Sequence, residues 1–397
     1  MAVLGMRGTG TWSSDERPNN WREKLLYLFP NSPAIMTALV SKLANEVVDD
    51  PKFNWFEKGL PVMRLYNVGT AAAGAVSLTV ESAAADVTST TPASVVRKGM
   101  VMMNERTLEV FWVVADPVSP FTSITVARGQ GDVVAAQMND NDGLLIIGTA
   151  HQEGEALPVA IQHSPSTVFN YTQIFRTSGS ITRTAKKTRY RTGDAVKELK
   201  RQCLEMHGIQ MEFAFLFGAR TEDLSGAQPK RTTGGMRHYV STNVKNFASA
   251  VTIDDWDDYM ELMFKYGSSE KLCLCGSTVL NVLNKMCRDK YTIQATPTTE
   301  TYGMKMEEWT TPYGTLYLKQ HPLLTQNPTF TSWGFIIDAK NLRYRYIDDT
   351  MWKESKIESS SENLVDAQNS EFLTECGLEI WFEQTHGIFK NADVYIP

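Results

Sequence analysis

The sequence has no hydrophobic run long enough to cross a membrane. No window of the 397-residue chain approaches the roughly 18 consecutive apolar residues that a transmembrane helix needs. Its first residues, MAVLGMRGTGTW, lack the charged-then-apolar order of a signal peptide. We therefore expect neither a membrane-spanning protein nor one that is secreted through such a peptide.

Cysteine is scarce, and its pattern argues against disulfide bonds. There are five cysteines, an odd number, and they are widely spread: Cys203, Cys273, Cys275, Cys287 and Cys376. Small disulfide-stapled proteins have many closely spaced cysteines. The pattern predicts synthesis in a reducing, intracellular compartment.

The common catalytic signatures are also missing. The chain has no Gly-rich phosphate loop with its lysine, no dinucleotide fingerprint, no His-Glu-x-x-His helix and no Gly-x-Ser-x-Gly elbow. We therefore predict that it is not an enzyme and has no catalytic, cofactor-binding or metal-binding residues. An enzyme with an unrecognised site stays a less favoured alternative, because acid, base and nucleophile can be distant in sequence.

Three groups of residues could form sites, and we interpret all three as structural. Cys273 and Cys275 lie one residue apart, closer than paired zinc ligands, and on a strand they share one buried face. The acidic residues near 254–261 match the first turns of a helix rather than a calcium loop. None of the histidines has a partner at useful spacing. The acidic residues are Asp254, Asp255, Asp257, Asp258 and Glu261, and the histidines are His207 in a helix, His386 in a turn, and His151, His163, His238 and His321 in loop-like sequence.

Charge is distributed unevenly along the chain. The net charge is −6, and residues 65–165 hold four basic and ten acidic side chains, so this region alone accounts for the total. Ala, Val, Thr and Gly dominate it, in short alternating runs separated by turn residues. We expect a small antiparallel β-barrel or sandwich over about 67–165, solvated and not in contact with nucleic acid.

The stretch Thr188–Gly218 predicts a long helix around which the rest is organised. Its apolar residues recur every three or four positions and so form one stripe. Over 188–217 such a helix would be roughly 40 Å long, and Gly218 suits its C-terminal cap. The predicted stripe is Val196, Leu199, Cys203, Met206, Ile209, Phe213 and Leu216.

A run of positive charge surrounds the start of this helix. It contains eight cations against only Asp194 and Glu198. Two interpretations carry equal weight: a basic face that meets phosphate or an acidic neighbouring subunit, and an ordinary solvated helix face. The cations are Arg183, Lys186, Lys187, Arg189, Arg191, Lys197, Lys200 and Arg201.

The remaining sequence predicts an α+β lobe and closing strands. Two helices, Asp254–Tyr266 and Thr278–Arg288, flank the strand Lys271–Cys275, and further strand pairs follow to residue 347. The last segment, 371–397, has the pattern of two strands. At about 150 residues per domain, the length suggests two or three lobes.

The order of these parts, and several local stretches, resemble a known family. The chain is similar to the major capsid protein of tailed bacteriophages with the Hong Kong 97 type of fold, and specifically to the phage SU-ten major head protein family. The stretches that carry the resemblance are FPNSPAIMTALVSKLANEVVDDPKFNWFE (29–57), NYTQIFRTSGSITRTAK (170–186), KELKRQCLEMHGIQMEFAFLFGAR (197–220) and ECGLEIWFEQTHGIFKNAD (375–393).

The resemblance implies a division of the chain. It implies an N-terminal arm and first peripheral strand (1–64), an extended loop carrying the inserted β-domain (65–186), a peripheral domain with the long helix (187–249), an axial domain (250–350) and closing peripheral strands (351–397). Some relatives crosslink through lysine–asparagine bonds. The only lysine between residues 65 and 165 is Lys98, and we do not predict crosslinking here.

The implied function is self-assembly into pentamers and hexamers of an icosahedral shell around double-stranded DNA. The implied partners are further copies of the chain, a portal, scaffolding or decoration proteins, and DNA bound without sequence specificity. The protein would be made in the host cytoplasm and reside in the virion. The alternatives are an encapsulin-like shell with protein cargo, and a tail or decoration component that uses 65–165 as a binding module.

Overall fold

The computed structural model describes residues 34–43, 45–59, 63–82, 92–162, 164–190, 193–290, 299–301, 304–354 and 367–396. Most of the predicted N-terminal arm, residues 1–33, lies outside these ranges. The chain forms two compact units, one of residues 1–54 with 169–397 and one of residues 55–168. Helices and strands are both abundant, as the predicted α+β class requires.

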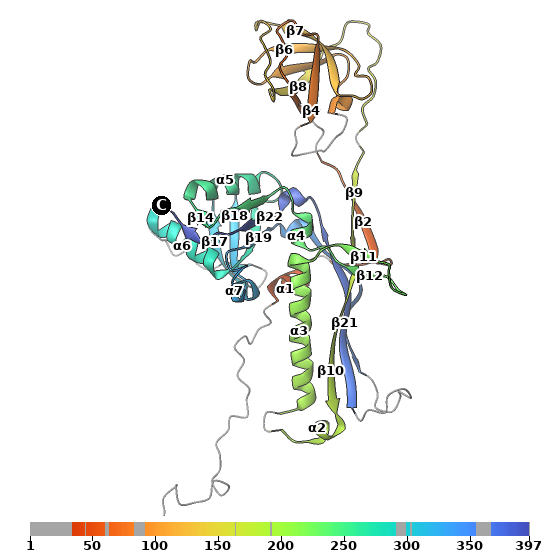
Figure 1. Cartoon of the computed structure of the whole chain (residues 1–397), viewed down its shortest axis with the longest axis vertical. Helices are drawn as coiled ribbons and strands as arrows, with labels where there is room; N and C mark the ends of the chain where they lie inside the picture. Colours follow the sequence, from red (N-terminus) through yellow and green to blue (C-terminus); the bar gives the residue numbers. More distant parts are fainter. Residues whose placement is uncertain are drawn as a thin grey trace, which may run out of the picture. The chain divides into compact units, whose positions relative to one another are not determined.

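The first unit contains a four-stranded sheet with a long helix packed along it (Figure 1). The strand order is β1-β20-β21-β10, with β1 parallel to β20 and the other pairs antiparallel. Gly179 on β10 permits close packing of the helix α3, because a Cβ there would lie 2.7 Å from Cys203 Sγ. The bounds are β1 (Asn45–Val47), β10 (Gln173–Thr182), β20 (Leu342–Glu354), β21 (Ala367–Ile380) and α3 (Ala195–Phe217).

The long helix begins seven residues later than predicted. α3 starts at Ala195, where the Asp194 carboxylate accepts a hydrogen bond from the backbone N–H of Val196 at 2.9 Å. Gly193 just before it has a φ of +109°, which no helix allows. Residues Arg183–Lys187 form a separate short helix, α2. At 1.5 Å per residue, the 23 residues of α3 span about 35 Å.

The buried stripe of α3 also differs from the prediction. Met206 was expected inside, but its side chain is 56% exposed. The buried positions are Cys203, His207, Met211, Glu212, Phe215 and Leu216. Of the seven predicted positions, only Cys203 and Leu216 are buried, while Val196, Leu199, Ile209 and Phe213 are half-buried. The stripe therefore includes two polar residues that a search for apolar periodicity leaves out, and five of the apolar residues that such a search takes in are not fully buried.

A seven-stranded sheet forms the α+β part of the same unit, in the order β13-β22-β19-β15-β18-β17-β16. Helices α5 and α6 pack on one of its faces, and α3 and α1 contribute to the core on the other. The strands are β13 (Val244–Asn246), β15 (Glu270–Cys275), β16 (Thr299–Thr301), β17 (Met304–Thr310), β18 (Thr315–Gln320), β19 (Gly334–Ile337) and β22 (Gly387–Lys390), and the helices are α1 (Ile35–Val40), α5 (Ile253–Phe264), α6 (Ser277–Lys290) and α7 (Pro322–Gln326).

Sheet pairing does not follow the predicted boundary near residue 350. β22 belongs to the segment predicted to close the peripheral domain, yet it pairs with β19 and β13 in the seven-stranded sheet. Conversely, β20 begins at Leu342 within the predicted axial domain but pairs with β21 in the four-stranded sheet. Each of these two predicted segments therefore contributes strands to both sheets, and the two sheets share one apolar core. A boundary drawn along the sequence cannot separate the sheets. The smaller elements are α4 (Met236–Tyr239), β11 (Thr221–Asp223), β12 (Lys230–Thr232), β14 (Ala250–Val251) and β23 (Val394–Tyr395), with 3-10 turns at Ala339–Asn341 and Glu383–Thr385.

The second unit is built around a closed six-stranded barrel with antiparallel neighbours, in the order β3-β4-β7-β6-β5-β8. The chain enters and leaves this unit through β2 (Lys52–Glu57) and β9 (Ser166–Tyr171), which pair with each other (Figure 1). The strands are β3 (Arg64–Asn67), β4 (Ser77–Ser82), β5 (Met100–Asn104), β6 (Val110–Ala115), β7 (Ser123–Gln130) and β8 (Gly143–Thr149), with a 3-10 turn at Pro92–Val95.

The barrel has its own apolar core, to which inward-facing residues of its strands contribute. Beside that core lies an ion pair between Glu109 and Arg128, whose side chains are 0% and 4% exposed. The Glu109 carboxylate accepts hydrogen bonds from Arg128 at 2.5 and 2.9 Å and from two backbone N–H groups. Arg128 also donates to the carbonyls of Ala72 and Ala136. Such a buried pair is tolerated because every polar group in it has a partner.

Candidate functional site

The predicted cysteine pair lies in a core. Cys273 and Cys275 on β15 are fully buried on the face that α5 and α6 cover, while Leu272 and Leu274 point into the other core. Burial raises the pKa of the Cys273 thiol well above its usual value, which disfavours the thiolate that a metal requires. The interpretation as small core residues is confirmed.

The predicted acidic cluster caps a helix. Thr252 Oγ1 accepts from the N–H of Asp255 at 3.1 Å and donates to Asp255 Oδ2 at 2.9 Å, a reciprocal cap at the start of α5. Lys245 Nζ lies 3.2 Å from Asp255 Oδ1. Among the residues that the structure describes, no group of three or more His, Cys, Asp or Glu side chains is arranged to hold a metal ion.

His207 is a structural residue, as predicted. Its Nδ1 lies 3.1 Å from Thr177 Oγ1 and its Nε2 lies 2.8 Å from Thr374 Oγ1, so the ring links α3 to β10 and β21. Burial lowers its pKa and so favours the neutral ring. His163 lies outside the described residues.

The prediction that His151 and His321 have no partner is wrong: His151 Nδ1 lies 3.1 Å from Glu155 Oε2, and His321 has a buried partner. His321 Nε2 lies 2.6 Å from Glu212 Oε1, and both side chains are 0% exposed. Glu212 projects from the C-terminal part of α3 and accepts three more hydrogen bonds, from the backbone N–H groups of Met36 and Thr37 and from Thr37 Oγ1, at 2.6 to 2.8 Å. One carboxylate therefore joins α3 to the first turn of α1 and to the residue before α7. We call this group, Glu212 with His321, Met36 and Thr37, the Glu212 junction.

Sequence reasoning missed this junction, although a signal for it exists. Glu212 is the one charged residue between His207 and Gly218, inside the otherwise apolar run MEFAFLFG. A carboxylate in such a run must either be solvated or have a buried partner. The partners His321, Thr37 and Met36 lie 109, 175 and 176 residues from Glu212 along the chain. Spacing in the sequence could therefore not identify them.

A second buried polar cluster joins the seven-stranded sheet to the end of α5. Lys271 Nζ donates to the carbonyls of Met263, Tyr266 and Thr385 at 2.6 to 2.8 Å. Burial lowers its pKa to about 8. Nearby, His386 Nδ1 accepts from the backbone N–H of Asp338 at 3.2 Å, and burial lowers the pKa of His386 to about 4. These contacts satisfy the carbonyls at a helix end and are structural.

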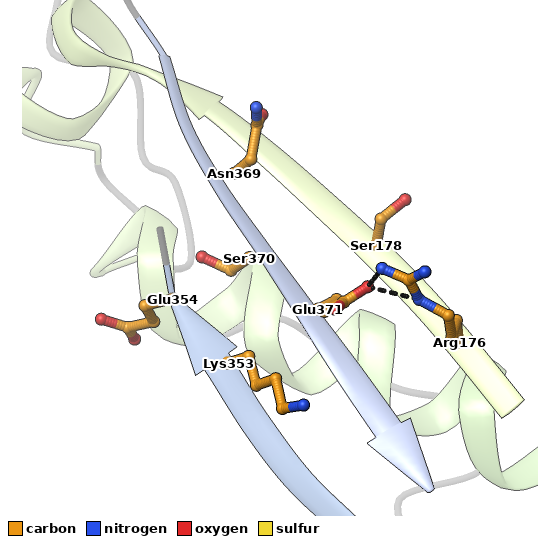
Figure 2. Close-up of a pocket in the computed structure, with 7 residues that line it drawn as sticks. All are labelled: Arg176, Ser178, Lys353, Glu354, Asn369, Ser370 and Glu371. Carbon is orange, nitrogen blue, oxygen red and sulfur yellow. Dashed lines mark hydrogen bonds and ion pairs between the residues drawn. The ribbon is translucent and has the colours of Figure 1, made fainter. Parts of the chain in front are cut away.

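A hollow on the first unit lies across three strands of the four-stranded sheet and is lined by polar and charged residues. Arg176 and Glu371 point toward each other across it and pair at 2.6 Å (Figure 2). Lys353 and Glu354 add one charge of each sign, so the hollow has no net charge with which to attract an ion.

The predicted basic run is exposed on α2 and the first turns of α3. Lys186 Nζ donates to Gln368 Oε1 at 2.7 Å, and Lys200 Nζ lies 5.3 Å from the centre of the Trp352 ring. Arg191 lies outside the described residues. The described members, Arg183, Lys186, Lys187, Arg189, Lys197, Lys200 and Arg201, are all exposed, and we call them the basic face.

The groups described above are structural or lie on exposed surfaces. Comparison with known proteins identifies the family to which the chain belongs. The profile of the SU10 major capsid protein family matches residues 6–393. The chain belongs to this family. A curated relative, the major capsid protein of Pseudomonas phage PaMx41, is 27% identical over 380 residues, which cover 90% of this chain and 88% of the relative.

Solved structures similar to this family member include phage capsids and related shells. The capsid of a native GTA particle matches 98% of this chain and 100% of its own, at 8% identity and a TM-score of 0.48. A structure from Mycobacterium phage Bobi matches 97% of each chain, at 6% identity and a TM-score of 0.46. The SrpI encapsulin of Synechococcus elongatus PCC 7942 matches 59% of this chain and 79% of its own, at 13% identity and a TM-score of 0.42.

Family membership confirms the resemblance stated from the sequence. The protein is a phage major capsid protein, a structural subunit of the virion shell. This favours the capsid hypothesis over the encapsulin-like, tail and decoration alternatives. No helix among the described residues is long and apolar enough to span a bilayer.

Proposed function

We propose that this protein assembles into pentamers and hexamers of an icosahedral shell that encloses double-stranded DNA, using the Hong Kong 97 type of fold. The family match over residues 6–393 carries the proposal. The chain needs no catalytic centre for this function, because assembly depends on surfaces repeated in every copy. Synthesis takes place in the host cytoplasm, and the portal and scaffolding proteins join the shell.

Roles for the parts follow from this proposal. The four-stranded sheet with α3 is the peripheral domain, and the seven-stranded sheet with α5 and α6 is the axial domain near the centres of the rings. The excursion over 55–168 is the extended loop with its inserted barrel. The two sheets share one apolar core and belong to one compact unit, which supports the proposal that the peripheral and axial domains move as one body.

The charges of the two units favour opposite sides of the shell. Residues 65–165 have a net charge of −6, which suits an outer surface away from packaged DNA, whereas the basic face suits the inner surface or a subunit contact. Labelling intact particles with a bulky amine reagent tests this placement. The lysines of the basic face should be protected and Lys98 on the barrel should react, and the opposite result would reverse the placement.

Microscopy of the purified chain tests the assembly itself. After a sizing column, the recombinant protein should form closed shells, or rings of five and six copies, in negative stain. Particles recovered from infected cells should hold DNA that resists nuclease until they are opened. A chain that stays monomeric at all salt and protein concentrations, with no shells in lysates, would contradict the proposal.

A further inference from the structure

The outer surface of the barrel has one apolar face, formed by β6, β5 and β8. The register places Trp112 beside Val101, and Val110 beside Met103, which is beside Leu145 on β8. These side chains alternate with the buried residues Met102, Phe111 and Ile146, so they point outward. Trp112 and Ile147 are each 48% exposed. The members of this apolar face are Val101, Met103, Val110, Trp112, Leu145 and Ile147.

The opposite side of the barrel is polar. On β4 and β7, Ser77 is paired with Thr125 and Thr79 with Ser123, and all four are exposed. Exposed apolar residues also occur elsewhere in this unit, at Val76, Val118, Val133 and Val134, whereas the apolar face extends over three hydrogen-bonded strands. Its six members carry no charge, within a region whose net charge is −6.

The segment Ala156–Gln162, which follows the barrel, is a second apolar surface. Leu157, Val159 and Ile161 are 96%, 60% and 44% exposed. The apolar residues alternate as they do in a half-buried strand, yet the structure assigns no helix or strand to residues 155–162. Exposed apolar residues gathered in this way mark an interaction site.

The start of this segment is fixed to the barrel. The Glu155 carboxylate pairs with Lys98 Nζ at 2.7 Å and lies 3.1 Å from His151 Nδ1 and from the backbone N of Gln152. The Lys98 ammonium holds the pKa of Glu155 at about 2, well below its usual value. The segment therefore leaves the barrel at a defined point, which lowers the entropic cost of docking it elsewhere.

We propose that residues 156–162 of one copy dock on the apolar face of the barrel of a second copy. This inference rests on the proposed shell, which brings many copies of the chain together. Two acidic barrels repel each other except where uncharged surfaces meet, and both of these surfaces are uncharged. The contact joins unlike surfaces, so it repeats head to tail and can close into a ring, as pentamers and hexamers require.

Photocrosslinking in assembled particles tests the contact. Leu157 is replaced by benzoylphenylalanine, and shells are assembled from equal amounts of 15N-labelled and unlabelled chains. After irradiation, mass spectrometry should find residue 157 joined to peptides of β5, β6 or β8, with both isotopes in about half of the products. The same reagent at Thr79 on the polar side is the matched control and should give less than a fifth of that yield.

The outcomes separate this inference from the proposed function. Shells that give only single-isotope crosslinks, crosslinks to other segments, or crosslinks to a different protein overturn the docking inference alone. Failure to form shells contradicts both. As a second variant, Trp112→Glu should lower the crosslinking yield at least fivefold, whereas Thr125→Glu should not. An equal yield from both variants would also overturn the inference.

Discussion

At the scale of single residues, the stability of this subunit depends on buried charges that connect separate elements of the fold. Glu212, Lys271 and the Glu109–Arg128 pair are each fully bonded inside an apolar core. Burying a charge costs several kcal/mol unless its partners are retained. These residues therefore hold particular segments together. Removing one partner leaves a buried charge without compensation and lowers the stability of the fold.

Glu212→Gln should destabilise the first unit by about 2–4 kcal/mol, because one carboxylate oxygen becomes an amide nitrogen, which cannot accept the hydrogen bonds made either by Met36 and His321 or by Thr37. Urea unfolding gives the free energy, and hydrogen exchange should show lost protection at Met36 and Thr37. Glu205→Gln, at a half-buried position of the same helix, is the control and should change stability by less than about 0.5 kcal/mol. Equal effects of the two variants would refute the account of the Glu212 junction.

His386 should make the first unit less stable in mild acid. Its pKa is about 4 when folded, against an ordinary value of 6.5, so the unfolded chain binds more protons between these values. Stability is then fully present above pH 6.5 and falls as the pH drops toward 4, by about 3 kcal/mol in total. The dependence of unfolding free energy on pH over this range should be flatter in His386→Gln. An identical slope in the variant would show that other groups cause the acid sensitivity.

At the scale of elements, the barrel has one apolar core, and α3 with the sheets of the first unit has another. A mutation in either core should therefore destabilise that part of the chain alone. Among the residues that the structure describes, those that form the barrel core all belong to the second unit. Sequence patterns indicated a small barrel or sandwich over about 67–165, because period-2 alternation and turn residues are local signals, although the first barrel strand begins earlier, at Arg64. They misplaced the start of α3 and the exposure of Met206, because the cap at Asp194 and the neighbours of each helix face depend on the tertiary fold.

Glu109→Gln should loosen the barrel alone. It leaves the Arg128 guanidinium buried without its counter-charge, at a cost of about 3 kcal/mol. Amide exchange in β6 and β7 should become about 100-fold faster, while α3 and β21 keep their protection. Glu105→Gln breaks a half-exposed pair with Arg64 and should cost less than about 1 kcal/mol. Exchange that rises equally in α3 would show that the two units unfold together.

At the scale of the whole molecule, the sequence predicted the class, the inserted barrel and the family, but not how segments are shared between sheets. β22 follows β21 by only six residues, yet it belongs to the other sheet. The assignment of consecutive strands to different sheets depends on long-range pairing, which propensity and periodicity do not report. The Glu212 junction was missed for the same reason, since its partners lie more than 100 residues away along the chain.

The most direct test of the central claim is a cryo-electron microscopy reconstruction of particles formed by this chain. The account predicts a closed icosahedral shell in which α3, the two sheets and the barrel can be traced in every copy, arranged in rings of five and six. A reconstruction that places this chain only on the outside of another protein's shell, or in a tail, would contradict the claim.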